Sequence, residues 1–509
     1  MSSLARRFHD ETAHTPYSVR TSGHTLDWDN KPFPFKIYTD APAVALPRDV
    51  DVLAAPTLQA VVAPAAPAPR LTLGALSALL YYTAGVTKKK MYPGGGEVLF
   101  RAAASTGALY QTEVYVVAGE VEGLEAGLYH FCPGDFTLRR LRAGDARVVL
   151  ADAAVDPSLA RRAATLVLSA IYWRNTWKYQ ARGYRHLFWD SGTMLANALA
   201  AGGALGLEPS IVTGFVDDEV NRLLDLDADR EAALELVPVG PEGAPAAPPG
   251  DLPRLAHDVM PLSSEEVDYP ALREIHAVSG LRAHDEVVAW RRAIAPAPRE
   301  PRGPVIALAE PALDSRPLGE AIQRRGSTRR FGPAPLSVRE LSAALWTATR
   351  PIPADVPGGL IDVCVIVNAV DGVEPGAYAY WPEHGLEQLR AGEFRREAAY
   401  LTLEQALGGD AAATIFFLAP LDAILAAWGE RGYRLANLEA GIAGGRAYLA
   451  AYGLGFGASG LTFYDADVVR FFSPHAEGRD AIFVTALGRA GSTQHGMLLS
   501  NPISPPRRS

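Results

Sequence analysis

The segment Arg182-Gly183-Tyr184-Arg185 recurs as Arg431-Gly432-Tyr433-Arg434, at an offset of 249 residues (431 − 182). The same offset relates Thr213 to Thr462 (462 − 213). Self-similarity at a fixed spacing is the sequence signature of a repeated structural unit. We therefore expect the chain to be two copies of one domain.

The two copies differ in length upstream of these markers. Gly127-Leu128-Tyr129 matches Gly376-Ala377-Tyr378 at 249, whereas Leu76-Ser77-Ala78 matches Leu341-Ser342-Ala343 at 265 (341 − 76). The second copy therefore lacks 16 residues (265 − 249) between these two markers. Features present in only one copy are where we expect the function to be encoded.

Composition limits the class of protein. The chain has 509 residues, an apolar content of 48%, a charged content of 21% and a formal net charge of −9. A net acidic chain argues against nucleic acid or an anionic membrane surface as the main partner. The two cysteines, Cys132 and Cys364, cannot form a disulfide framework or a cysteine-rich metal site, which fits a cytoplasmic location and predicts no bound metal. Residues 1–10 lack the apolar run of a signal peptide.

Proline- and alanine-rich stretches divide the chain. Residues 41–70 and 240–253 are of this kind, and proline favours extended linkers over helix or sheet. We expect a first domain at 1–240, a linker at 241–258 and a second domain at 259–509. A helical lead-in at 270–292 and a further proline-rich stretch at 295–304 precede the second repeat proper.

The hydrophobic pattern within each copy mixes helices and strands. Helical periodicity is predicted for 71–84, 336–348, 188–205 and 435–452, and strands for 112–117, 361–367 and 481–487. The long alanine-rich helices 188–205 and 435–452 should be buried against each other. The chain lacks a βα rhythm and a dinucleotide-binding glycine fingerprint, so the fold class is α+β.

The first chemical motif is a cluster of arginines and hydroxyls. Four arginines, one serine and one threonine occupy 324–330, just before a helix expected from Ser337. Arginine forks match phosphate oxygens, so Arg325, Ser327 and Arg329 are candidate phosphate ligands. The alternative is a solvated basic turn. At the 265-residue offset, the first copy has Ala60, Val62 and Pro64 at these three positions.

The second motif is a loop of small residues. Ser105 and Gly107 lie in the stretch that the second copy shortens, and small residues let the backbone approach a flat ligand closely. The alternative is an ordinary loop that leads into a strand.

The third motif is the adjacent pair Lys178 and Tyr179. Both side chains have high reference pKa values that a buried site can tune for proton transfer. The second copy has Ala427 and Trp428 at the aligned positions, neither of which transfers a proton. The alternative is a surface lysine beside a core tyrosine.

Together these motifs resemble a known family. The arginine–serine cluster ahead of Pro335-Leu336-Ser337 is similar to the opening of FMN-dependent nitroreductase-fold proteins. The Ser105–Tyr110 stretch, the Gly-Leu-Tyr hairpin and the Lys178-Tyr179 pair resemble the SagB/ThcOx branch of that superfamily. The head of the chain, from Phe8 to Lys36, is similar to long members of the branch.

The resemblance implies an internal pseudo-dimer of two fused nitroreductase-like domains. Family members are normally homodimers with FMN at the subunit interface, where one protomer holds the phosphate and its partner packs against the flavin ring. Here Arg325, Ser327 and Arg329 would come from the second copy, and Ser105 and Gly107 from the first. One complete FMN site can form, and the opposite site should be inactive.

Further contacts follow from the resemblance alone. The family's backbone contact to the flavin edge matches Gly460, Leu461 and Thr462, and its C-terminal basic phosphate contact matches Arg489. The chain departs from the branch at Gln111, where proline is more common.

The resemblance favours an FMN-dependent dehydrogenase that converts azoline rings of a ribosomally made peptide to azoles. Lys178 and Tyr179 would then be catalytic and handle the proton, with a cyclodehydratase as a possible partner. One alternative is a generic flavin nitro or quinone reductase, which does not need the lysine–tyrosine pair. Another is a flavin-free scaffold of a peptide-modifying complex.

Overall fold

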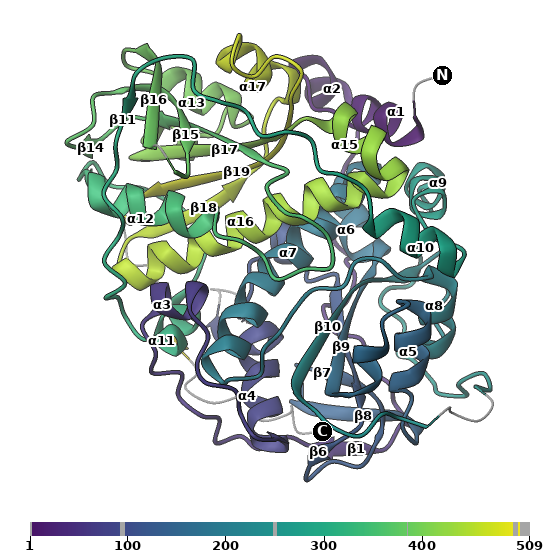
Figure 1. The fold of residues 1–509 in the computed structure, drawn as a ribbon. Helices are drawn as coiled ribbons and strands as arrows, with labels where there is room; N and C mark the ends of the chain where they lie inside the picture. Colours follow the sequence, from purple (N-terminus) through teal and green to yellow (C-terminus); the bar gives the residue numbers. More distant parts are fainter. Residues whose placement is uncertain (1–2, 92–96, 248–251, 384, 492–496, 499–509) are drawn as a thin grey trace.

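The computed structural model describes residues 3–91, 97–247, 252–383, 385–491 and 497–498. Each half of the chain builds one mainly antiparallel sheet with helices around it (Figure 1). The strand order is β1-β8-β7-β5-β9-β10 in the first half and β11-β16-β15-β13-β17-β19-β18 in the second. Two copies of one α+β domain are therefore confirmed.

The sheet and helices of the first half have the following bounds: β1 (Ala43–Ala45), β5 (Thr112–Ala118), β7 (Gly127–Cys132), β8 (Thr137–Ala143), β9 (Arg162–Ile171), β10 (Glu231–Glu242), α4 (Leu73–Ala84), α5 (Arg147–Ala153), α6 (Tyr172–Tyr179), α7 (Gly183–Ala204) and α8 (Asp217–Leu224).

Those of the second half are: β11 (Val305–Ile306), β13 (Asp362–Val367), β15 (Gly376–Trp381), β16 (Gly385–Ala391), β17 (Ala413–Ala419), β18 (Gly457–Leu461), β19 (Asp480–Gly488), α12 (Val338–Ala348), α13 (Arg395–Leu401), α14 (Ala406–Asp410), α15 (Leu421–Trp428), α16 (Gly432–Leu454) and α17 (Asp465–Phe472).

Shorter elements connect and flank the halves: α1 (Leu4–Glu11), α2 (Pro16–Thr21), α3 (Thr57–Val62), α9 (Pro270–Val278), α10 (His284–Arg291), α11 (Leu318–Arg324), β2 (Leu71–Thr72), β3 (Val86–Met91), β4 (Glu97–Arg101), β6 (Val121–Glu122), β12 (Leu336–Ser337), β14 (Val370–Asp371) and β20 (Met497–Leu498). None of the helices in the described ranges is long and apolar enough to cross a membrane.

Two helix starts and one linker differ from expectation. Residues 71–72 and 336–337 form strands β2 and β12 before their helices, because they pair with β6 and β14. The proline-rich stretch 41–70 was expected to be an extended linker, but it contains α3 because only its later part, from residue 63, is dense in proline. Strand β10 runs to Glu242, past the predicted end of the first domain.

The long helices α7 and α16 cross at the centre of the molecule and join the halves (Figure 1). Gly192 and Gly441, 249 residues apart (441 − 192), lie at the crossing. A Cβ added at Gly192 would meet the Ile442 nitrogen at 2.7 Å, and one at Gly441 the Trp189 oxygen at 2.6 Å. Glycine at both positions lets the two backbones touch.

A pair of buried ionic braces flanks this crossing. Asp465 of the second half accepts from Arg182 and Arg185 of the first, and Asp217 of the first half accepts from Arg431 and Arg434 of the second. The repeated Arg-Gly-Tyr-Arg segment that reveals the duplication therefore ties each copy to the other.

The N-terminal helices of the two copies complete the braces. The carbonyl of His9 in α1 accepts from Arg185, and the carbonyl of His276 in α9 accepts from Arg434. Helix α1 also lies beside α15 of the second half (Figure 1), and Glu430, in the turn after α15, accepts from the Leu4 nitrogen. The described fold is thus a pseudo-dimer within one chain, as expected.

Candidate functional site

The arginine cluster lies at the end of α11, where the first half covers it. Arg325 follows the helix directly, and its side chain is only 6% exposed. Its guanidinium donates to the carbonyls of Arg101, Ala102 and Ala103 at 2.7–3.0 Å. Arg325 therefore fixes the start of the small-residue loop of the first copy to the second copy.

Ser327 belongs to a short polar chain inside the second half. Its hydroxyl lies 3.0 Å from the Tyr448 hydroxyl, which accepts from the Gly460 nitrogen at 2.6 Å. The Thr328 nitrogen donates to the Ala458 carbonyl. The predicted phosphate turn and the predicted flavin-edge strand are therefore held side by side through Tyr448 of α16.

Arg329 is exposed, and its charge acts on Lys178 and Tyr179, the predicted proton-transfer pair of the other copy. Burial, Arg329 and Lys31 together lower the pKa of Lys178. Burial and Asp190 raise the pKa of Tyr179 above its ordinary value, and Arg329 opposes this rise. The two predicted motifs thus converge from opposite halves of the chain.

The small-residue loop is anchored by Asp190 of α7. Its carboxylate accepts from the Thr106 nitrogen, the hydroxyls of Ser105 and Thr106, and the Gln111 amide. Burial raises the pKa of Asp190 to about 6 although these donors favour its charged form. Gln111, the departure from the branch, is therefore part of the anchor.

Gly107 at the tip of this loop has a φ of +65°, which favours glycine. A Cβ at Gly107 would lie 2.9 Å from the Tyr179 hydroxyl. The Tyr179 ring contacts His186 edge-on at 4.5 Å between centroids, and the Lys178 ammonium lies 5.4 Å from the Tyr179 ring. The loop tip and the lysine–tyrosine pair thus form one wall.

The remaining predicted residues lie in the second half. Leu461 ends β18, and the Thr462 hydroxyl is 3.1 Å from His14. Arg489 forms an ion pair of 2.8 Å with Glu340 at the start of α12. Its guanidinium is thereby bound to a carboxylate.

The pseudo-symmetric position opposite this site is filled by protein. The nitrogens of Thr213 and Gly214, which match the flavin-edge turn, donate to the carboxylate of Asp355 at 2.9 Å. The Ile211 nitrogen donates to the Pro353 carbonyl, and Arg291 also binds Asp355. The loop around Asp355 therefore occupies the backbone donors of the second position.

The alignment of the phosphate turn with the first copy needs a correction. Ala63 follows α3 as Arg325 follows α11, an offset of 262 (325 − 63). The offset of 265 is wrong here because the second copy has extra residues between this turn and the following helix. Residues 60–68 contain no arginine, so the first copy lacks the cluster in either alignment.

Sequence reasoning missed Asp190, Tyr448 and Asp355. The repeat could have revealed Asp190, because a second carboxylate, Glu439, stands 249 residues later (439 − 190). Like Asp190, Glu439 accepts from backbone nitrogens of a loop, those of Gly359 and Leu360. Tyr448 and Asp355 have no counterpart in the other copy that could have marked them.

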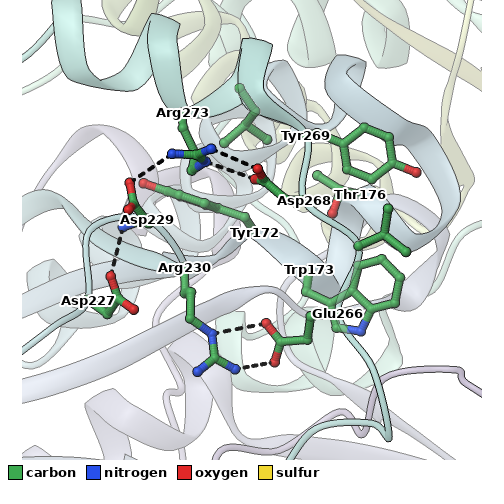
Figure 2. Close-up of a pocket in the computed structure, with 12 residues that line it drawn as sticks. Tyr172, Trp173, Thr176, Asp227, Asp229, Arg230, Glu266, Asp268, Tyr269 and Arg273 are labelled. Carbon is green, nitrogen blue, oxygen red and sulfur yellow. Dashed lines mark hydrogen bonds and ion pairs between the residues drawn. The ribbon is translucent and has the colours of Figure 1, made fainter.

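A cavity of about 390 Å³ lies beside α6 (Figure 2). Tyr172, Trp173 and Thr176 of α6 line one side of it. Two ion pairs lie at its edge, Arg230–Glu266 at 2.6 Å and Arg273–Asp268 at 2.7 Å (Figure 2). None of the residues predicted for catalysis or cofactor binding lines this cavity, although Lys178 and Tyr179 end the same helix.

Comparison with known proteins gives relatives of this arrangement. The trifolitoxin-processing protein TfxB of Rhizobium leguminosarum is 30% identical over 176 residues, 33% of this chain and 47% of the relative. The microcin B17-processing protein McbC of Escherichia coli is 28% identical over 136 residues, 26% of this chain and 50% of the relative. The chain thus spans about half the length of these two relatives.

A solved structure covers nearly the whole chain. The crystal structure of a nitroreductase-type protein from Anabaena variabilis has a TM-score of 0.77 and 28% identity, and it matches 96% of this chain and 100% of its own. The profile of the Nitroreductase family matches residues 66–241 and 322–477, one match per half. The chain therefore belongs to the nitroreductase family of oxidoreductases.

Proposed function

We propose that the protein is an FMN-dependent dehydrogenase that oxidises azoline rings of a ribosomally made peptide to azoles. The observation that carries this proposal is that Arg325 of one half binds the start of the loop of the other half whose tip, Gly107, lies against Tyr179. Relatives named for the processing of trifolitoxin and microcin B17 support a peptide substrate. A cyclodehydratase that forms the azoline would be the partner.

The residues present fit a flavin. Ser327, Arg329 and the Arg325 Nη1, which the bonds to the three carbonyls do not use, form a donor set suited to a phosphate. Arg489 would join it only if its bond to Glu340 were exchanged. Gly107 leaves open the space that a Cβ would fill beside Tyr179. We propose that the turn Gly460–Thr462 borders the flavin edge and that Ser105 shapes the opposite wall.

Bound FMN would supply the acceptor for the hydride. Azoline oxidation removes one hydride and one proton from the ring, so the protein must accept the proton. Burial, Arg329 and Lys31 lower the pKa of Lys178, and we propose that its amine accepts this proton. The raised pKa of Tyr179 keeps its phenol protonated, so Tyr179 would donate a hydrogen bond to the substrate.

The test is anaerobic flavin bleaching by a synthetic thiazoline peptide. Lys178→Ala and Tyr179→Phe should slow bleaching by ~10²–10⁴-fold while FMN stays bound, because a lost proton-transfer group typically costs that much. Trp428→Phe, at the aligned position of the other copy, is the matched control and should bleach at the wild-type rate. Equal rates in all variants would favour the alternative, a generic nitro or quinone reductase.

A further inference from the structure

A hairpin found only in the first half reaches across to the arginine turn of the second. Strands β3 and β4 form this hairpin between α4 and the small-residue loop, in the region that the second copy shortens. Strand β20, near the end of the chain, pairs with β3. Through Lys88 of β3, the hairpin contacts the turn that follows α11.

Lys88 makes the contact. Its Nζ donates to the carbonyl of Arg324 at 2.5 Å and to that of Arg325 at 2.6 Å. A Cβ on Gly326 would lie 3.4 Å from the same nitrogen, so the ammonium sits directly above the turn that leads to Ser327. Two of its three N–H groups are used by these carbonyls.

Most of the positive charge at this turn lacks a partner of opposite sign among the described residues. Arg324 pairs with Glu320 at 2.8 Å. Among the described residues, no carboxylate lies within ion-pair distance of Lys88, Arg325 or Arg329. Burial, Arg325 and Arg324 lower the pKa of Lys88 to about 7. Clustered, partly buried cations without a counter-ion are costly, and a phosphate group would offset that cost.

We propose that Lys88 is a phosphate ligand of the cofactor, contributed by the first half to the turn of the second. The inference rests on the proposed flavin site. The proposal gives the β3–β4 hairpin a function. A site on the opposite side of the pseudo-dimer would lack the Lys88 ammonium, because the second half has no such hairpin among its described residues. A lysine ammonium acts as a point charge, so its third N–H can reach a phosphate while two hold the turn.

The competing explanation is that Lys88 only caps the end of α11. The two differ in what they predict for riboflavin, which has the flavin ring but no phosphate. Binding of FMN and of riboflavin to the full apo-chain, followed by quenching of flavin fluorescence, separates them. Lys89→Met is the matched control, since Lys89 lies on the same hairpin and pairs with Glu97.

Lys88→Met should weaken FMN binding by roughly 10- to 100-fold, because a charge-assisted contact to phosphate is worth that much, and should leave riboflavin unchanged. Lys88→Arg should keep most of the preference for FMN, and Lys89→Met all of it. Equal weakening of both ligands, or of neither, would overturn the proposal. Wild-type protein that binds no FMN would overturn the proposed function as well.

Discussion

At the scale of single residues, Glu235 carries an unusual buried carboxyl group. It lies on β10 beside the brace arginines Arg431 and Arg434, and Ser191 donates to its Oε1 at 2.8 Å. Its Oε2 has no hydrogen-bond partner among the described residues. Burial raises the pKa of Glu235 to about 8, although Ser191 and the two arginines oppose the rise.

Glu235→Gln should therefore remove a pH-dependent part of the free energy of unfolding. The folded pKa of about 8 exceeds the ordinary 4.5, so the native state holds the proton longer than the unfolded state. The contribution of Glu235 to the free energy of unfolding is fully present below pH 4.5 and is lost as the pH rises through about 8. Relative to the variant, the wild type should lose on the order of a few kcal/mol across that window.

Denaturant midpoints of both proteins at a series of pH values measure this difference. Parallel curves for the wild type and Glu235→Gln would contradict the assignment of a raised pKa. The variant keeps an oxygen acceptor for Ser191, so loss of that hydrogen bond does not confuse the result.

From the sequence, a candidate residue could be chosen where a motif stands in one copy alone, but its contacts with the other half could not be predicted. The side chains of Arg329, Lys178 and Tyr179 could be singled out because one copy retains each motif and the other does not. The bonds of Arg325 to three carbonyls of the first half could not be foreseen, since sequence does not show which donors the fold itself uses. The cofactor roles of these residues stay predictions.

At the scale of elements, the two ionic braces hold the halves together. Each aspartate is buried between two arginines, and Arg431 and Arg434 outweigh burial and lower the pKa of Asp217 to about 2. Removing one member of a buried ion pair leaves uncompensated charge. Asp217→Ala and Asp465→Ala should each lower the free energy of unfolding by ~3–5 kcal/mol.

The control is an exposed ion pair of similar length. Glu404→Ala removes the 2.9 Å pair with Arg20, in which both side chains are at least half exposed, and should cost ~0–1 kcal/mol. The contribution of Asp217 to the free energy of unfolding should be fully present above pH 3.8, the ordinary pKa of an aspartate. It should be lost as the pH falls through about 2. If Asp217→Ala and Asp465→Ala are no less stable than Glu404→Ala, the buried ion pairs do not hold the two halves together.

Element prediction worked best for long periodic segments. The two long helices and the strands at 112–117, 361–367 and 481–487 all form, with ends that shift by a few residues. The correspondence of α1 with α9 was missed, because the two helices share little beyond His9 and His276. Their equivalence is visible only in the arginines that bind both.

At the scale of the whole molecule, the two sides of the pseudo-dimer are unequal. One side combines the arginine turn, the Asp190-anchored loop and the lysine–tyrosine pair. On the other side, Asp355 occupies the backbone donors of Thr213 and Gly214, and the turn after α3 lacks arginine. We therefore expect one FMN per chain.

Flavin released by denaturation, divided by the polypeptide concentration, measures this ratio. A value near two would refute the single site. A value near zero without rebinding would favour the scaffold alternative. Asp355→Ala should leave the ratio at one, because opening the backbone donors does not supply the missing phosphate ligands.

The final prediction concerns the dependence of the first half on the second. Residues 1–245 alone would expose the face of α7 around Gly192 that α16 covers in the full chain. Arg182 and Arg185 would lose Asp465, which leaves two buried guanidiniums without their carboxylate. The fragment should therefore be insoluble or self-associate, since both the uncovered helix face and the unpaired guanidiniums need a partner. Size-exclusion chromatography with light scattering is the measurement. A soluble, folded monomer of residues 1–245 would show that the halves are independent domains. The ionic braces would then orient the two halves relative to each other without being needed for either to fold.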